Sequence, residues 1–284
     1  MDKPDKLYKY CDQGGLNILE TNEIKVSHFF DFNDPFEINP VFDKNEVKKH
    51  FEIILNNALK KTHKAIPDSE IEALEKAFRE DLHKMYRKVA NDNTYLLCFS
   101  TTPDNLLMWA HYAGQHKGIV IEFDGKHDFF QEHLDQQNNS KNFRKVNYPK
   151  DKNRPPCSIK SLQNRAPHSF DNHIQNNFFT KSADWEYEQE WRMVFPPDNE
   201  NIREETPQNN KKHFLLKFPP DCISGVIIGC RAWEKENDQE SFAEKLINKI
   251  EERRQYYSSD FQIKKAVLDE SEYKLNIKNV LKIS

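Results

Sequence analysis

The chain has 284 residues, of which 37% are hydrophobic and 31% charged, and its formal net charge at pH 7 is −4. Its 20 Phe, 10 Tyr and 4 Trp are enough large side chains to bury a core. Only 7 Gly are present, and none lies in a phosphate-cradling loop, so P-loop and dinucleotide-fingerprint enzymes are excluded. The small net charge makes a duplex-DNA partner unexpected, because such a partner needs a broad basic face.

Membrane and secretory signals are missing from the sequence pattern. No apolar stretch approaches the ~18 residues of a membrane span, and the first residues are charged where a secretory signal would be apolar. The sequence therefore predicts a cytoplasmic protein with no membrane partner. The 5 cysteines are widely spaced without a CxxC pair, so we expect unbridged thiols and no bound metal.

Short strands are predicted near the start of the chain, where apolar residues alternate at 6–10 and 23–30. A short helix or turn is expected between them. The next segment, 32–37 (FNDPFE), is typical of a turn because it contains an Asn-Asp-Pro run.

A pair of helices is predicted next, at about 44–62 and from Ser69 to about 90. Ser69 and Glu72 have the spacing of a capping box. The second helix carries an apolar stripe that we expect to pack on a core; its residues are Ile71, Leu74, Phe78, Leu82, Met85 and Val89. We interpret the pair as a helical hairpin inserted at about 44–90.

The rest of the chain interleaves strand and helix patterns without a regular βαβ rhythm. Thr102 is predicted to cap a short helix whose first residue is Pro103, and 196–212 is predicted to be a charged surface loop. The remaining predicted elements are strands at 95–100, 118–124, near 143–148, at the end of 181–195, and at 226–228, 261–268 and 272–277, with a helix at about 238–256. This pattern predicts a single α+β domain over 1–284 with a bent, mixed or antiparallel sheet.

Four short segments combine residue types that a core alone would not need, and they supply the candidate site residues. The candidates are Tyr8, Lys9 and Tyr10 in the first segment, Asn33, Asp34 and Glu37 in the second, Ser100, Trp109, His111 and Tyr112 in the third, and Glu188, Glu190 and Arg192 in the fourth.

The fourth segment is the most specific. Glu188 and Glu190 are two residues apart, so in an extended segment both carboxylates would face one side, ~6–7 Å apart. If that face is buried, one of them should have a raised pKa, and Arg192 could neutralise part of the charge. The structural alternative is an ion-pair ladder at a strand edge, with Trp185 and Trp191 as core anchors.

The third segment allows two interpretations. On a short helix, Trp109 and Tyr112 would share a face, most simply as part of a core. His111 would point elsewhere, as a hydrogen-bonded structural residue. Ser100 lies where a strand runs into a turn, a position that suits both site residues and capping residues.

The four segments in this order resemble the family called domain of unknown function 2971. The matching pieces are 7–10 (LYKY), 32–37 (FNDPFE), 98–124, 181–195 and 226–229 (VIIG). Together they span most of the chain from residue 7 to about 277.

The motif order is also similar to that of mono-ADP-ribosyltransferases, which have a first motif on an early strand, a second on a central strand before a short helix, and a catalytic Glu opening a later strand. This resemblance places the motifs at Tyr8–Tyr10, Ser100–Thr102 and Glu188–Glu190. The first motif departs from the pattern because it contains neither Arg nor His. The resemblance implies an ADP-ribosyltransferase-like fold with NAD as co-substrate.

The same resemblance implies roles for the candidate residues. Glu190 would hold a ribose hydroxyl and stabilise an oxocarbenium-like state, and Glu188 would deprotonate an unknown macromolecular or small-molecule acceptor. A bacterial toxin or phage-defence effector would fit this chemistry. Candidates for stacking on nicotinamide or adenine are Tyr8, Tyr10, Trp109 and Tyr112, and candidates for the pyrophosphate are Lys9, Lys181 and Arg192.

Two other functions remain open at this point. A metal-dependent nuclease or phosphoesterase would gather carboxylates for Mg²⁺; the candidates are Asp34, Glu37, Glu188 and Glu190, with Lys181 nearby in sequence. Alternatively, the chain is a non-catalytic ligand-binding or interaction module, in which Glu188 and Glu190 are structural.

Overall fold

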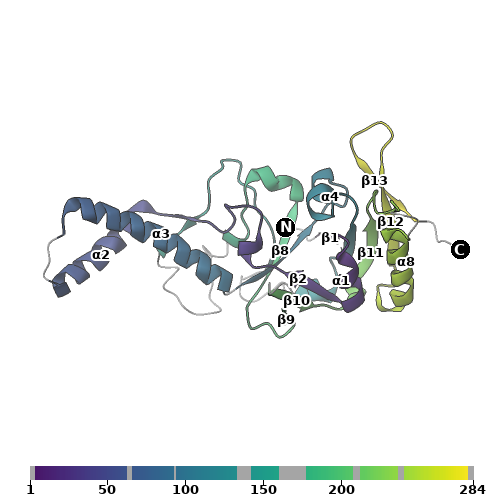
Figure 1. Ribbon diagram of the computed structural model, residues 1–284, viewed down its shortest axis with the longest axis horizontal. Coiled ribbons are helices and arrows are strands. Elements are labelled where there is room, and N and C mark those ends of the chain that lie inside the picture. The colour runs from purple at the N-terminus through teal and green to yellow at the C-terminus, as the bar shows by residue number, and fades with distance from the viewer. Residues whose placement is uncertain are drawn as a thin grey trace. The chain divides into compact units, whose positions relative to one another are not determined.

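The computed structural model describes residues 4–62, 66–92, 94–132, 142–159, 177–206, 212–235 and 240–280 (Figure 1). Its helices and large mixed sheet give an α+β fold, as the sequence predicts. The chain divides into two compact units. Unit 1 consists of Met1–Ser27, Leu96–Val146 and Asp184–Ser284, and unit 2 of His28–Tyr95 and Asn147–Ala183.

An eight-stranded sheet dominates unit 1, with the strand order β13-β12-β11-β5-β1-β4-β8-β6. β11 and β12 pair in parallel, whereas β1 pairs antiparallel with both β4 and β5. The strands are β1 (Lys6–Cys11), β4 (Tyr95–Ser100), β5 (Ile119–Asp124), β6 (Phe143–Lys145), β8 (Glu190–Phe195), β11 (Ile223–Ile228), β12 (Gln262–Leu268) and β13 (Leu275–Asn279). All eight were expected from the sequence within a few residues.

The register of β1 divides the sheet into two faces. Tyr8 lies opposite both Glu122 and Ser100, so these side chains share one face. The short helix α4 (Leu106–Tyr112) packs on that face, where Trp109 and Met108 join a buried cluster with Tyr8 and Tyr10. The opposite face carries a buried group of aromatic rings, Phe99, Phe123, Phe130 and Phe143, the third of them from α5 (Asp128–Glu132).

Helix α8 (Phe242–Arg253) joins the parallel strands β11 and β12 and runs alongside them (Figure 1). Ser241 caps it: its Oγ accepts a hydrogen bond from Glu244 N, and the Glu244 carboxylate accepts one from Ser241 N. α8 buries Ala243, Leu246, Ile247 and Ile250, and the 3₁₀ turn η4 (Arg254–Tyr256) follows it. The predicted helix at 238–256 is therefore present but shorter.

Unit 1 also contains a three-stranded sheet of order β2-β10-β9, formed by β2 (Glu23–Val26), β10 (His213–Lys217) and β9 (Ile202–Glu205). β9 corrects the predicted surface loop at 196–212, of which 207–211 lie outside the described residues. Ile202 pairs with Leu216, and such cross-strand pairing stabilises a segment whose own charged sequence lacks a strand pattern. Two further elements here are α1 (Gly15–Thr21), in the segment predicted as helix or turn, and the 3₁₀ turn η3 (Pro220–Cys222).

Unit 2 contains the predicted helical hairpin, formed by α2 (Lys44–Thr62) and α3 (Asp68–Asp92), which lie side by side (Figure 1). Its other elements are the 3₁₀ turn η1 (Phe29–Asp31), which ends the strand predicted at 23–30, and the short parallel pair β3 (Val41–Phe42) and β7 (Pro156–Cys157).

Two expectations about α3 are wrong. The Pro67 carbonyl accepts the first hydrogen bonds of α3, from Glu70 N and Ile71 N, so Ser69 lies inside the first turn and is not the cap. The apolar stripe is only partly covered: Leu82 is 5% exposed, whereas Leu74 is 44% and Met85 48% exposed. Helical spacing identifies a shared face, but a neighbouring element must cover that face along its whole length.

None of the described helices has the length and apolar character needed to span a bilayer. All 5 cysteines lie among the described residues, and none forms a disulfide.

Candidate functional site

The three predicted motif segments meet on neighbouring strands of unit 1. Tyr8 on β1 lies directly opposite Ser100 on β4, and β8, which Glu190 opens, is the next strand beyond β4. The Ser100 hydroxyl donates a hydrogen bond of 2.7 Å to the Glu188 carbonyl, and Thr101 N donates one of 3.3 Å to the Gln189 carbonyl. Segments far apart in sequence therefore lie next to one another.

The chain around the two carboxylates is not extended, contrary to the expectation from their spacing. Glu188 ends the 3₁₀ helix η2 (Ala183–Glu188), and β8 begins only at Glu190. Gln189, between them, has a φ of 46°, in the left-handed region that few side chains adopt. Its backbone and side-chain N–H groups both donate to the Glu186 carbonyl, which stabilises this turn.

Glu190 and Arg192 form a buried ion pair. Arg192 Nε and Nη2 each donate a hydrogen bond of 2.9 Å to one carboxylate oxygen of Glu190. Glu190 is 4% exposed and Arg192 0%. A two-point contact of this kind fixes the plane of the carboxylate. Burial, with the Glu190 charge second, raises the pKa of the nearby Cys98 thiol, so Cys98 stays protonated at neutral pH.

Glu188 is also buried, and a tyrosine from α4 contacts it. The Tyr112 hydroxyl donates a hydrogen bond of 2.7 Å to Glu188 Oε1. The two carboxylates therefore lie in different surroundings: a guanidinium contacts one and a phenol contacts the other. This difference is suited to two distinct chemical roles.

The start of α4 differs from the prediction. Asn105 is the cap, and its Oδ1 accepts hydrogen bonds from Leu107 N and Met108 N. Thr102 lies before the helix, where its carbonyl accepts a hydrogen bond from the Tyr10 hydroxyl. A short Asn side chain can reach two backbone N–H groups at once, so Asn105 caps the helix in place of Thr102.

The predicted aromatic candidates are largely part of the core. Trp109 is fully buried, donates through Nε1 to the Pro103 carbonyl, and packs edge-on against Tyr10 with a centroid distance of 5.6 Å. Burial, followed by the charges of Glu122 and Asp104, raises the pKa of Tyr8 to about 12. Burial likewise raises the pKa of Tyr10, so both phenols are neutral at pH 7.

The basic and imidazole candidates in unit 1 have different environments. Lys9 Nζ donates a hydrogen bond of 3.0 Å to the Cys98 carbonyl and so links β1 to β4. His111, near the end of α4, is exposed, and its ring lies 6.3 Å from that of Tyr112, centroid to centroid.

Sequence reasoning missed a third buried carboxylate, Glu122 on β5, which is 2% exposed. Lys264 Nζ donates to its Oε2 at 2.7 Å, Lys6 donates to Oε1, and the Ser224 hydroxyl lies 3.2 Å from Oε1. Burial acts to raise the pKa of Glu122, but the hydrogen bonds from the two lysines outweigh it and lower the pKa. The available signal was one acidic residue inside the apolar strand GIVIEFD.

The second segment, with Asn33, Asp34 and Glu37, and Lys181 lie in unit 2. Asp34 and Glu37 are buried, whereas Asn33 is exposed. Asp34 Oδ1 accepts a hydrogen bond of 2.8 Å from Phe36 N, which makes the predicted turn. Lys181 Nζ lies 3.7 Å from Glu37 Oε2. Within the described ranges, no group of three or more His, Cys, Asp or Glu side chains is arranged to hold a metal ion.

An open groove of about 470 Å³ lies in unit 1 beside the turn at Gln189. Thr102, Asn105 and Leu106 line it before and at the start of α4, Tyr187 and Gln189 line it around the turn into β8, and Tyr273 contributes from the β12–β13 hairpin. Because Gln189 lies between Glu188 and Glu190, the groove gives a small molecule access to this turn.

Comparison with known proteins supports the first family resemblance. The model of the family described as Protein of unknown function (DUF2971) matches residues 108–193. That range includes Tyr112, Glu188, Glu190 and Arg192. Neither the curated proteins nor the solved structures contain a match to the chain.

Proposed function

We propose that the chain is an ADP-ribosyltransferase-like enzyme that cleaves NAD and transfers ADP-ribose to an acceptor. The observation that carries the proposal is the meeting of Tyr8, Ser100 and the Glu188–Glu190 turn on neighbouring strands, beside an open groove. The three motifs of this enzyme class must lie together around one nucleotide. A bacterial toxin or phage-defence effector would use such a reaction.

Glu190 is proposed to stabilise the reacting ribose. In the reaction, the bond between ribose C1′ and nicotinamide breaks, nicotinamide leaves with the electron pair, and positive charge develops on the ribose. The Glu190 carboxylate would counter that charge and accept a hydrogen bond from a ribose hydroxyl. Arg192 supports this role by fixing the carboxylate plane, and each carboxylate oxygen can accept more than one hydrogen bond.

Glu188 is proposed to take the proton of the acceptor as the acceptor atom bonds to C1′. The Tyr112 hydroxyl, 2.7 Å from Oε1, orients this carboxylate. The two carboxylates are joined through Gln189, whose left-handed backbone turns the chain sharply between them. This turn supports a division of roles in which one carboxylate faces the ribose and the other the incoming acceptor.

Several residues predicted to contact the cofactor are better suited to shaping the site. Arg192 is hydrogen-bonded to Glu190, Lys9 is hydrogen-bonded to the Cys98 carbonyl, and Trp109 is buried in the core. Tyr187, which lines the groove, offers an aromatic surface on which a nucleotide base can stack.

The test is nicotinamide release from NAD by the purified protein in whole-cell lysate, which supplies acceptors. Glu190→Gln alone is a poor variant because it leaves the buried Arg192 charge unpaired. Glu190→Asp keeps the charge and shortens the side chain by one methylene, and Glu190→Gln with Arg192→Gln keeps the pair neutral. We expect both variants to lose about 100-fold or more in rate.

Glu205→Gln is the matched control, because Glu205 is an exposed carboxylate on β9 of the same unit. It should release nicotinamide at the wild-type rate. If folded wild-type protein releases no nicotinamide, the proposal is wrong. Release that continues unchanged in both Glu190 variants would remove this carboxylate from the reaction.

A further inference from the structure

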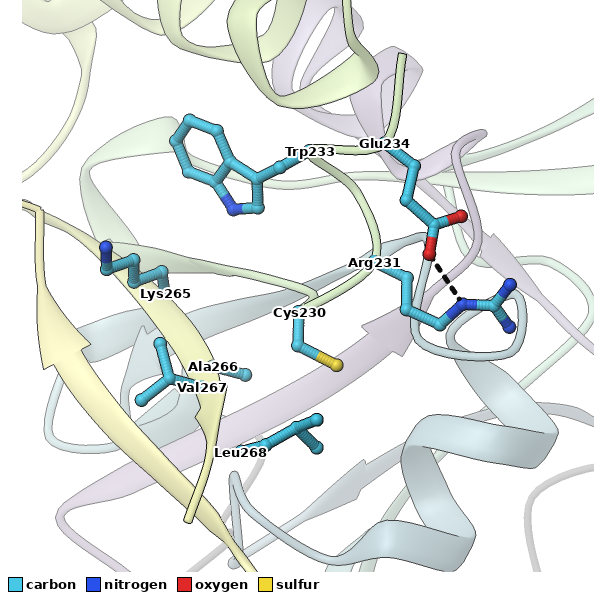
Figure 2. A pocket seen from close by; sticks show the side chains of 8 residues that line it. All are labelled: Cys230, Arg231, Trp233, Glu234, Lys265, Ala266, Val267 and Leu268. Atoms are coloured by element: carbon cyan, nitrogen blue, oxygen red, sulfur yellow. Dashed lines mark hydrogen bonds and ion pairs between the residues drawn. The ribbon is translucent and has the colours of Figure 1, made fainter. Parts of the chain in front are cut away.

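A second pocket in unit 1 lies at the carboxyl ends of its parallel strands. β11 and β12 run parallel and are joined through α8, and in parallel α/β units small molecules bind beyond the carboxyl ends of the strands. An open pocket of about 450 Å³ lies there (Figure 2). Its lining comes from the loop after β11, including Cys230, Arg231 and Trp233, and from Lys265–Leu268 of β12. We name it the β11–β12 pocket.

One wall of the pocket carries an unused hydrogen-bond donor. Trp233 Nε1 is buried and has no hydrogen-bond partner, although buried polar atoms nearly always have one. In Figure 2 the indole nitrogen lies on the side of the ring that faces β12. An acceptor atom on a bound molecule would satisfy this N–H group.

The rim of the pocket carries uncompensated positive charge. Lys265 lies directly opposite Lys278 of β13, and like charges in this arrangement repel each other. Within the part of the chain that the structure describes, neither ammonium group has an acidic partner. Arg231, also at the pocket, is paired with Glu234 at 2.9 Å. A bound anion would relieve the repulsion between the two lysines.

The rest of the lining is apolar. Val267 lies on the same side of β12 as Lys265, and the indole of Trp233 adds apolar surface to the lining, whereas Ala266 and Leu268 line the pocket from the other side of the strand. The volume is that of a site for one small organic molecule. The ligand therefore needs an apolar body as well as a negative charge.

We propose that the β11–β12 pocket binds a small aromatic anion, a phosphate ester or carboxylate. The anionic group lies at Lys265, the ring packs on Val267, which shares the Lys265 face of β12, and an oxygen accepts the Trp233 indole hydrogen bond. The pocket lining contains none of the candidate carboxylates, so this inference stands independently of the proposed transferase activity.

Phenyl phosphate is the probe, and the reporter is the indole N–H resonance of Trp233 in the nuclear magnetic resonance spectrum of the ¹⁵N-labelled full chain. The 4 Trp give four such signals, and Trp233→Phe identifies the one that belongs to the pocket. We expect this signal to shift and saturate with a Kd of ~1 mM or lower. Inorganic phosphate, which lacks the ring, and phenol, which lacks the anion, should each bind at least about tenfold more weakly.

Lys265→Gln should weaken phenyl phosphate binding about tenfold, whereas Lys245→Gln, an exposed lysine on α8 outside the pocket, should leave it unchanged. Both positions are accessible, so the variants should fold. The proposal is wrong if phenyl phosphate does not shift the Trp233 signal, or if the two lysine variants weaken binding equally. Equal binding of inorganic phosphate and phenyl phosphate would also contradict it, because the ring would then contribute nothing.

Discussion

The large sheet of unit 1 and the α2–α3 hairpin of unit 2 hold their charged residues in opposite ways. In the sheet, Glu122, Glu190 and Arg192 are nearly inaccessible and make short hydrogen bonds to charged partners. On the hairpin, pairs such as Lys88–Asp92 lie at the surface, one helical turn apart. The sequence is rich in charge in both regions, so the number of charges does not distinguish them.

Burial makes the difference between the two regions. In an ion pair that is buried away from water, each charge depends strongly on the other for its stabilisation, because removing one partner leaves a charge that is not solvated. Removing one partner of a surface ion pair lowers the stability of the fold only slightly, since water replaces the missing partner. A charged residue in a buried strand is therefore the feature that indicates a site. Variants in the two regions should differ in how far they lower the free energy of unfolding.

The largest effect on stability is expected for Arg192→Gln. The change leaves the Glu190 carboxylate buried without its guanidinium, so the free energy of unfolding should fall by about 3–5 kcal/mol. Urea denaturation followed by circular dichroism measures it. Adding Glu190→Gln should recover part of the loss, because two neutral amides can hydrogen-bond to each other. If the double variant is less stable than Arg192→Gln alone, the two side chains are not coupled as described.

Glu122→Gln is expected to have the next largest effect and to lower the free energy of unfolding by about 2–3 kcal/mol at pH 7. The variant can still form hydrogen bonds, but it loses the negative charge between Lys6 and Lys264. The folded-state pKa of Glu122 is lowered, so its stabilisation is fully present above its unfolded pKa of about 4.3 and is lost as the pH falls through the folded pKa. The stability difference between wild type and variant should therefore shrink below about pH 4. A difference that stays constant from pH 7 to pH 3 would mean that the Glu122 charge does not stabilise the fold.

Glu75→Gln should have the smallest effect. Glu75 and Arg79 pair on α3 at a spacing of four residues, with side chains 22% and 42% exposed. Such helix-surface pairs contribute about 0.2–0.5 kcal/mol, so the urea midpoint should hardly move. A loss comparable to that of Glu122→Gln would remove the contrast between the two regions.

Much of the fold could be predicted from the sequence because its main elements have clear local patterns. β1, β4, β5 and the two hairpin helices have the expected apolar spacing and lie where it places them. β9 could not be found in this way, because its Ile202–Glu205 sequence forms a strand only through pairing with β10. The exposed part of the α3 stripe was missed for a similar reason, since sequence does not show what covers a face.

For the candidate site, residue types were easier to predict than local geometry. The expectation that Tyr8, Ser100 and the Glu188–Glu190 segment meet came from the resemblance in motif order, and the structure brings these segments together. The turn at Gln189 was not predictable, because Gln is not typical of a left-handed backbone. Glu122 was missed because its two lysine partners lie 116 and 142 residues away along the chain.

The order of the large sheet has a consequence for aggregation. Among the described strands, β6 and β13 form its two ends. β6 has only three residues, two of them Arg144 and Lys145, and β13 carries Lys278. Short edge strands with cationic side chains are poor templates for strands of other molecules. We therefore expect this sheet to resist edge-to-edge polymerisation even when the protein is concentrated.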